Sequence, residues 1–202
     1  MINVELDKPI VIDSFTASDI DAATRLSINN WGNELAKESA QLRQFVFEGM
    51  VRYYYRNSSL SAKAGDDAMQ GFLLACGYGD DDASKSWFAS QVKQFTPHEQ
   101  EVAHVYHDYL LRNGQELKRE MGSDDVLMGL FLSRQPGCGK RLLYEVADKA
   151  QQQGKRSLYL WADATCDYDY YARNGFKVVA SFENKNMPLL GNLATYIYQR
   201  LL

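Results

Sequence analysis

The chain has 202 residues, of which 46% are hydrophobic and 24% are charged, and its formal net charge is -4. This composition is typical of one substantial globular domain and excludes a disordered chain, while the negative charge gives no support to a nucleic-acid or anionic-membrane binder. The three cysteines are odd in number and far apart, so they do not indicate a disulfide framework. Because the sequence shows no secretory leader and no run of roughly 20 apolar residues, we expect a cytoplasmic protein.

The first part of the chain predicts a strand, two helices and a hairpin. The strand covers residues 10–12, and Ser18 is the expected N-cap of a helix that runs to about Trp31. Apolar residues at helical spacing predict a second helix over residues 40–55. Two β-like runs then flank a short loop that contains Gly65, which indicates a hairpin.

Residues 79–122 are polar and helical in character, and no Pro- or Ser-rich linker bounds them. We therefore interpret them as a helical insertion in one domain. Thr96 to Glu99 has the form of a capping box with proline at the first helical position, and the helix is expected to break at Asn113-Gly114. All three histidines of the chain fall in this segment: His98, His104 and His107. Without a third ligand in the sequence, they do not predict a metal site.

From residue 124 onward the sequence predicts a strand ending at Leu132, a glycine turn, an amphipathic helix and a second strand over residues 158–162. A strand–helix–strand unit of this kind places its two strands parallel, through a right-handed crossover. A short helix over residues 167–173 and two further strands, over 176–182 and 193–200, complete the chain.

The glycine turn, Arg134-Gln135-Pro136-Gly137-Cys138-Gly139, is the most informative motif. The first N–H groups of a helix have no partner inside the helix, so a turn of this kind can hold a phosphate. The P-loop of nucleotide triphosphatases is the less favoured interpretation, because it would need glycine in place of Arg134 and a hydroxyl residue in place of Arg141. The dinucleotide pattern G-x-G-x-x-G is also not met, because its last position holds Leu142.

These six residues fit R/Q-x-x-G-x-G/A, the pyrophosphate signature of the GNAT superfamily of N-acetyltransferases, and the chain resembles that family. Residues 170–176, Tyr-Tyr-Ala-Arg-Asn-Gly-Phe, are similar to the family's F-Y-x-x-x-G-F segment, and Gly71-Phe72-Leu73 resembles its third strand. Residues 161–168 are similar to T-D-x-x-C-N-Y in an uncharacterised bacterial branch, with Ala162 and Asp167 as departures. The order of predicted elements also matches that family.

This resemblance implies an α/β (α+β) fold with a mixed central sheet of about six to seven strands flanked by helices. It implies a single domain over residues 1–202, in which residues 79–122 are the insertion and residues 124–176 are the acetyl-CoA-binding core.

The resemblance also implies acetyl-CoA as acyl donor, with no metal. Its pyrophosphate would be bound by the amides of the glycine turn and of the helix start: Gln135, Gly137, Cys138, Gly139 and Lys140. Arg134 would either contact the ligand or support the turn. The pantetheine arm would lie along the backbone of Leu130, Phe131 and Leu132. Arg173 would reach the adenosine 3′-phosphate, or would be a solvated charge at a helix end.

Catalysis by such a protein needs a base for the amine and a proton donor for the leaving thiolate. Tyr171 aligns with the family's donor, although it could equally serve in packing. Asp163 is the best-placed carboxylate, as base or substrate ligand, with a helix N-cap as the alternative. Cys166 is expected to be a small buried residue, because no histidine follows it to activate a nucleophile. Trp31 is a candidate for the acceptor site, against ordinary core packing.

The expected function is therefore acetyl transfer to a primary amine by direct attack, with a small molecule or a peptide as the acceptor and with neither nucleic acid nor membrane as a partner. The family resemblance suggests a homodimer. The alternative is a GNAT-fold module that binds CoA, or a protein partner, without chemistry.

Overall fold

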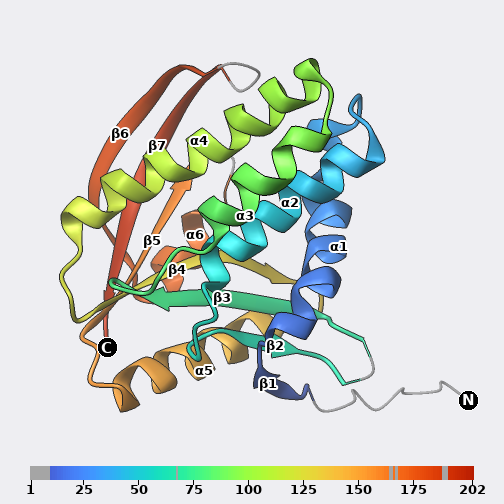
Figure 1. Cartoon of the computed structure of the whole chain (residues 1–202). Coiled ribbons are helices and arrows are strands. Elements are labelled where there is room, and N and C mark those ends of the chain that lie inside the picture. Colours follow the sequence, from blue (N-terminus) through green and yellow to red (C-terminus); the bar gives the residue numbers. More distant parts are fainter. Residues whose placement is uncertain (1–9, 67, 164–165, 167, 188–190) are drawn as a thin grey trace, which may run out of the picture.

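The computed structural model describes residues 10–66, 68–163, 166, 168–187 and 191–202. Within these residues, seven strands form one mixed sheet in the order β1-β2-β3-β4-β5-β7-β6 (Figure 1). The strands are β1 Ile12–Ser14, β2 Ala62–Ala64, β3 Gly71–Gly77, β4 Asp125–Ser133, β5 Ser157–Asp163, β6 Lys177–Met187 and β7 Gly191–Leu201. The β4–β5 pair is parallel and the other neighbours are antiparallel. The predicted mixed sheet and its parallel central pair are confirmed.

The helices follow the predicted order once the insertion is set aside. They are α1 Ile20–Trp31, α2 Ala40–Tyr55, α3 Ser84–Gln91, α4 Pro97–Glu120, α5 Cys138–Gln152 and α6 Tyr168–Arg173, with short 3-10 turns η1 Ala17–Asp19, η2 Gly32–Leu35 and η3 Val92–Gln94. The expected N-cap at Ser18 is wrong. The helical segment begins earlier, because the Asp19 carboxylate accepts a hydrogen bond from the Thr16 N–H at 2.8 Å and fixes the chain there.

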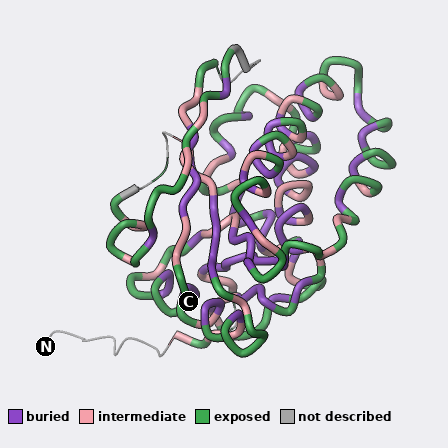
Figure 2. The backbone as a smooth tube through the Cα atoms, turned by 90° about the vertical axis from the view of Figure 1, so that its left-hand side faces the viewer, coloured by how far each residue is buried: buried purple, intermediate pink, exposed green. Residues whose placement is uncertain are grey.

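Two apolar layers cover the sheet, one on each face. Alternate residues of β3 point to opposite faces, so Phe72 and Leu74 pack with α2 while Leu73 and Ala75 pack with α5. All four are fully buried. Figure 2 shows the burial concentrated on the central strands and on the helix sides that face them. The residues of β3 are therefore apolar in succession and do not alternate with polar residues, as expected for a strand that is covered on both faces.

The insertion forms α3, η3 and α4 between β3 and β4, and α4 lies beside β5 and β6 (Figure 1). The predicted capping box is present, since the Glu99 N–H donates to the Thr96 hydroxyl and the Glu99 carboxylate accepts from the Thr96 N–H. The predicted break at Asn113-Gly114 is wrong, because α4 continues through both residues. A Cβ atom at Gly114 would lie 1.9 Å from the Tyr53 hydroxyl oxygen, so the glycine is there to let α2 approach closely.

Candidate functional site

The strands β4 and β5 separate towards their carboxyl ends. They pair only over Asp125–Leu127 and Ser157–Tyr159, although both strands continue beyond these residues. At Leu130 the chain takes a left-handed conformation, with φ 48°, and the register against β3 shifts there by one residue. This is a β-bulge, which bends the strand and disrupts the local ladder. The edge of β4 that faces β5 is thereby open over Leu130–Leu132, where an extended ligand can add as a strand.

The glycine turn follows directly at the end of this open edge. Gly137 takes a left-handed conformation with φ 79°, and no atom lies within 4 Å of the position that a Cβ would occupy. The Arg134 N–H donates to the Gln70 carbonyl at 2.9 Å, and the Cys138 N–H donates to the Gln135 carbonyl at 3.1 Å. These two amides hold the turn together, so in this conformation the helix start offers an anion the amides that follow Cys138.

At the start of α5, some residues are buried in the core and others are exposed and charged. Cys138 is fully buried and burial raises the pKa of its thiol, so this residue is part of the core rather than a thiolate. Gly139 is also buried, against Phe131 and Tyr170. Lys140 is exposed, and its ammonium lies 5.6 Å from the centre of the Tyr144 ring.

Tyr144 is a feature that sequence reasoning missed. Tyr144 is 52% exposed, and its ring centre lies 6.0 Å from the guanidinium of Arg200 in β7. Two cations therefore lie near an exposed aromatic ring in the first turns of α5. Arg173 is also exposed, at the end of α6.

The helix α6 presents two tyrosines in different directions. Tyr170 faces β4, with its ring 5.5 Å from that of Phe131, and burial raises the pKa of its phenol. Tyr171 faces the end of the sheet instead, with ring centres 5.8 Å from Phe176 and 5.5 Å from Tyr198. Tyr171 is partly buried among these rings, and its role as proton donor stays a prediction.

Asp163 is the last residue of β5, and it lies where the two strands have separated. Its Oδ2 accepts a hydrogen bond of 2.9 Å from the Tyr109 hydroxyl of α4. The N-cap alternative is disfavoured, because α6 begins only at Tyr168. The expectation that Cys166 is buried is wrong: it is exposed in the bend after β5, where its N–H donates to the Asp163 carbonyl and its sulfur lies 3.8 Å from Asp163 Oδ1.

Acidic and aromatic side chains from separate elements surround Asp163. Glu34 of η2 is solvent-exposed, yet nearby protein and the Asp163 charge raise the pKa of its carboxyl. Burial and then the charge of Asp163 raise the pKa of the Tyr109 phenol, and the Trp161 ring stands edge-on to Tyr109 at 5.5 Å. Tyr106, one turn earlier in α4, has its pKa raised to about 12 by burial and by Glu34 and Glu38.

Trp31, the predicted acceptor residue, ends α1 and packs between the main core and a cluster formed by α2, α3 and α4. This position fits the packing alternative. Glu34, about one turn later, is close enough to Asp163 for the charge of Asp163 to raise the pKa of its carboxyl. The sequence carried no signal for Glu34 or for the contact between Tyr109 and Asp163.

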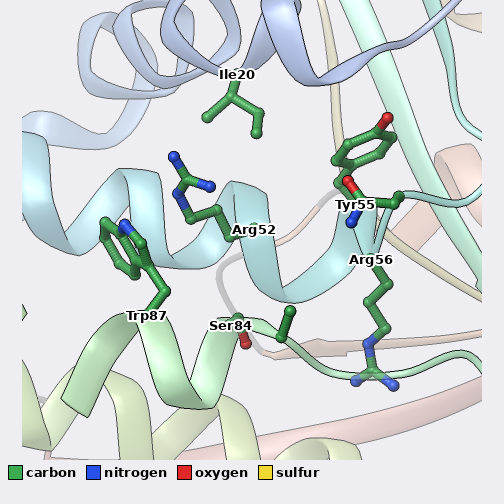
Figure 3. Close-up of a pocket in the computed structure, with 8 residues that line it drawn as sticks. Ile20, Arg52, Tyr55, Arg56, Ser84 and Trp87 are labelled. Carbon is green, nitrogen blue, oxygen red and sulfur yellow. The ribbon is translucent and has the colours of Figure 1, made fainter. Parts of the chain in front are cut away.

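Two other candidate sites have no comparable support. The rings of His104 and His107 pack on Phe88, and among the described residues no group of three His, Cys, Asp or Glu side chains could hold a metal ion. A cavity of about 50 Å³ lies between α1, α2 and α3 (Figure 3). Its two arginines are already engaged, Arg52 with Glu48 and Arg56 with Asp82 and backbone carbonyls, and its volume is far below that of a usual ligand pocket. Over the described residues, no helix is both long and apolar enough to cross a membrane.

No protein-family model matches the sequence, and no curated protein is significantly similar to it. Solved structures do match the fold. The PaiA N-acetyltransferase of Thermoplasma acidophilum, in complex with coenzyme A, has a TM-score of 0.56 at 13% identity, over 96% of this chain and 100% of that one. The polyamine N-acetyltransferase of Drosophila melanogaster, which forms N-acetylagmatine, has a TM-score of 0.57 at 10% identity, over 96% and 100% of the two chains.

An acetyltransferase of the GNAT family from Staphylococcus aureus has a TM-score of 0.54 at 14% identity, over 96% of this chain and 99% of that one. The chain therefore has the GNAT fold, as its sequence motifs predicted.

Proposed function

We propose that this protein is an N-acetyltransferase that transfers the acetyl group of acetyl-CoA to a primary amine. The observation that carries the proposal is the continuous path from the open edge of β4, through the bulge at Leu130, to the glycine turn at Gly137. Along this path, unpaired backbone N–H and C=O groups of β4 are followed by the N-terminus of α5. Such an arrangement can bind an extended ligand that has amide groups along its length and phosphates at its end.

The residues around the path fit acetyl-CoA. The backbone of Leu130–Leu132 would pair with the pantetheine arm, and the amides that follow Cys138 would bind the pyrophosphate. Lys140 and Arg200 both lie near the Tyr144 ring. They would offer positive charge, and the ring a stacking surface, to the adenosine end, alongside the predicted Arg173. When bound, acetyl-CoA supplies the acetyl group as an activated thioester.

Two side chains would then handle the protons. An amine arrives mostly as the ammonium ion and must lose a proton before its nitrogen can form a bond to the acetyl carbon. Asp163, at the separated end of β5, would accept that proton. As the carbon–sulfur bond breaks, the thiolate would take a proton from Tyr171. The second proton, which the nitrogen loses as the amide forms, would restore the Tyr171 hydroxyl.

The acceptor side of the site suits a cationic amine. The carboxylates of Glu34 and Asp163 lie close enough to interact, beside the aromatic side chains of Tyr109 and Trp161. Negative charge with an aromatic wall favours ammonium groups. The name of the Drosophila neighbour, a polyamine acetyltransferase, supports an acceptor of this class.

The test begins with calorimetric titration of acetyl-CoA into the purified protein without added metal. Gly137→Asp places a negative charge at the phosphate position and should weaken binding by about 30- to 100-fold, as expected for the loss of roughly 2–3 kcal/mol of charge-assisted contacts. Gly154→Asp is the matched control, because Gly154 also has a positive φ and open surroundings but lies beyond the other end of α5.

Turnover is then followed by thiol release with diamines and polyamines. Thiol release that depends on the amine, together with loss of binding in Gly137→Asp alone, is the expected result. Absence of acetyl-CoA binding by folded protein would overturn the proposal. Binding without transfer to any amine would leave a CoA-binding module as the function.

A further inference from the structure

The helix α4, which lies between β3 and β4 in the chain, brings a tyrosine onto the candidate base. The Tyr109 hydroxyl of α4 donates to Asp163 Oδ2 at 2.9 Å, across 54 positions of the sequence. Tyr109 is only 6% exposed, so this hydrogen bond is shielded from water on the α4 side. A bond in such surroundings is stronger than one at the surface and restricts the orientation of the carboxylate.

The backbone of α4 is fixed at the same level by buried polar contacts. One turn after Tyr109, the Asn113 Oδ1 accepts a hydrogen bond of 2.8 Å from the Asn184 side chain of β6. The same Asn184 nitrogen lies 3.0 Å from the Thr195 hydroxyl of β7, and all three side chains are fully buried. In the register of the sheet, Thr195 lies opposite Asp163. The helix is therefore tied to the sheet where its tyrosine meets the carboxylate.

Close packing on the other side of α4 completes this arrangement. Gly114 follows Asn113, and the Tyr53 hydroxyl of α2 occupies the space that a side chain there would need. Leu110 and Leu117 are buried in the same core. A helix held by α2 on one side and by β6 and β7 on the other has little freedom to move its Tyr109 relative to Asp163.

We propose that Tyr109 is a positioning residue, which orients Asp163 towards the acceptor amine through the hydrogen bond that its hydroxyl donates to Asp163 Oδ2. The inference rests on the proposed function in that Asp163 is the group that takes the proton from the amine. Titratable groups that face Asp163 include Tyr109 from α4, Glu34 from η2 and the Cys166 thiol from the bend after β5. Of these, Tyr109 is the one that donates a hydrogen bond to the carboxylate from a buried position.

The first variant is Tyr109→Phe, which keeps the ring and removes the donor. A hydrogen bond to an ionised carboxylate favours that form, so its loss should move the acidic limb of the kcat/KM–pH profile to higher pH, by about half a unit to one unit. We also expect kcat to fall by roughly tenfold, while the affinity for acetyl-CoA is unchanged. The matched control is Tyr159→Phe in β5, which also removes a buried tyrosine hydroxyl, in this case one that accepts a hydrogen bond from the Gln199 side chain. It should leave the pH profile and kcat as they are in the wild type.

A second measurement does not depend on activity. In protein labelled with carbon-13 at aspartate, the side-chain carboxyl resonance of Asp163 should titrate at higher pH in Tyr109→Phe than in the wild type. Replacing Tyr109 with 3-fluorotyrosine keeps the hydroxyl and makes it a stronger donor, so it should move the same resonance in the opposite direction. This replacement is nearly isosteric, so it keeps the test available if Tyr109→Phe folds poorly.

Unchanged titration of Asp163 in both Tyr109 variants would overturn the inference, whether or not any amine is acetylated. Loss of kcat in Tyr109→Phe with an unmoved pH profile and an unmoved resonance would also overturn it, because a merely structural role predicts that result. Absence of acetyl-CoA binding by the wild type would instead refute the proposed function and leave the titration experiment valid.

Discussion

The region where β4 and β5 separate has two proposed sides that are built in different ways. On the acetyl-CoA side, residues 130–140 form a bulge, a glycine turn and a helix start, and they would act mainly through their backbone. On the acceptor side, Glu34, Tyr109 and Asp163 come from three distant parts of the chain and act through their side chains. A ligand that many proteins share can be held by one short segment, whereas an acceptor that differs between proteins requires side chains that the whole fold brings together.

The largest effect is expected from Asp163→Asn, on the acceptor side. This change keeps the size of the side chain and removes its ability to accept a proton, so kcat should fall by about 100-fold or more. Calorimetry should show the same acetyl-CoA affinity as the wild type, because the glycine turn is untouched. A weaker affinity in this variant would show that the two sides do not act separately.

A smaller loss is expected from Tyr171→Phe, near the thioester end of the path. Removing the proposed proton donor should lower kcat by roughly tenfold or somewhat more, without affecting acetyl-CoA binding. The ring packing with Phe176 and Tyr198 would be kept, so thermal unfolding should be unchanged. Normal turnover with an established acceptor would remove Tyr171 from the mechanism and direct attention to Tyr170, which faces β4.

The smallest effect on chemistry, but a clear one on stability, is expected from Gly114→Ala. The new methyl group would strike the Tyr53 hydroxyl, and overpacking of this kind costs about 1–3 kcal/mol of unfolding free energy. Denaturant unfolding measures this loss. In the double variant with Tyr53→Phe, part of the loss should be recovered, because the clashing oxygen is absent. Equal losses of unfolding free energy in the single and double variants would show that α4 does not pack against the Tyr53 hydroxyl.

The sequence predicted the glycine turn because its signals are local. A strand, two glycines and an amphipathic helix in succession define the turn without reference to the rest of the fold. The order of elements followed from hydrophobic periodicity in the same way. The wrong N-cap at Ser18 shows the limit even of local signals, since the contact between Asp19 and Thr16, two residues before Ser18, decides where the helical segment begins.

The acceptor side could not be predicted, because its contacts depend on tertiary packing. Asn113-Gly114 has the composition of a helix break, and only the approach of Tyr53 and Asn184 shows that α4 contacts α2 and β6 there instead. In the sequence, Tyr109 is not distinguished from other residues of its helix. Its role depends on β5, which places Asp163 within hydrogen-bonding distance of the Tyr109 hydroxyl. Cys166 was expected to be buried, but the chain leaves the sheet after Asp163 and exposes it.

The bulge at Leu130 has a consequence for stability. Leu130 lies inside strand β4 and has a positive φ. For a residue with a Cβ atom, this conformation costs roughly 1–2 kcal/mol relative to an extended one. A continuous ladder between β4 and β5 would avoid this strain and would add hydrogen bonds, but it would close the path to the glycine turn. Selection for heat resistance alone would therefore tend to remove the bulge, and its presence indicates that this fold gives up some stability to keep the path open.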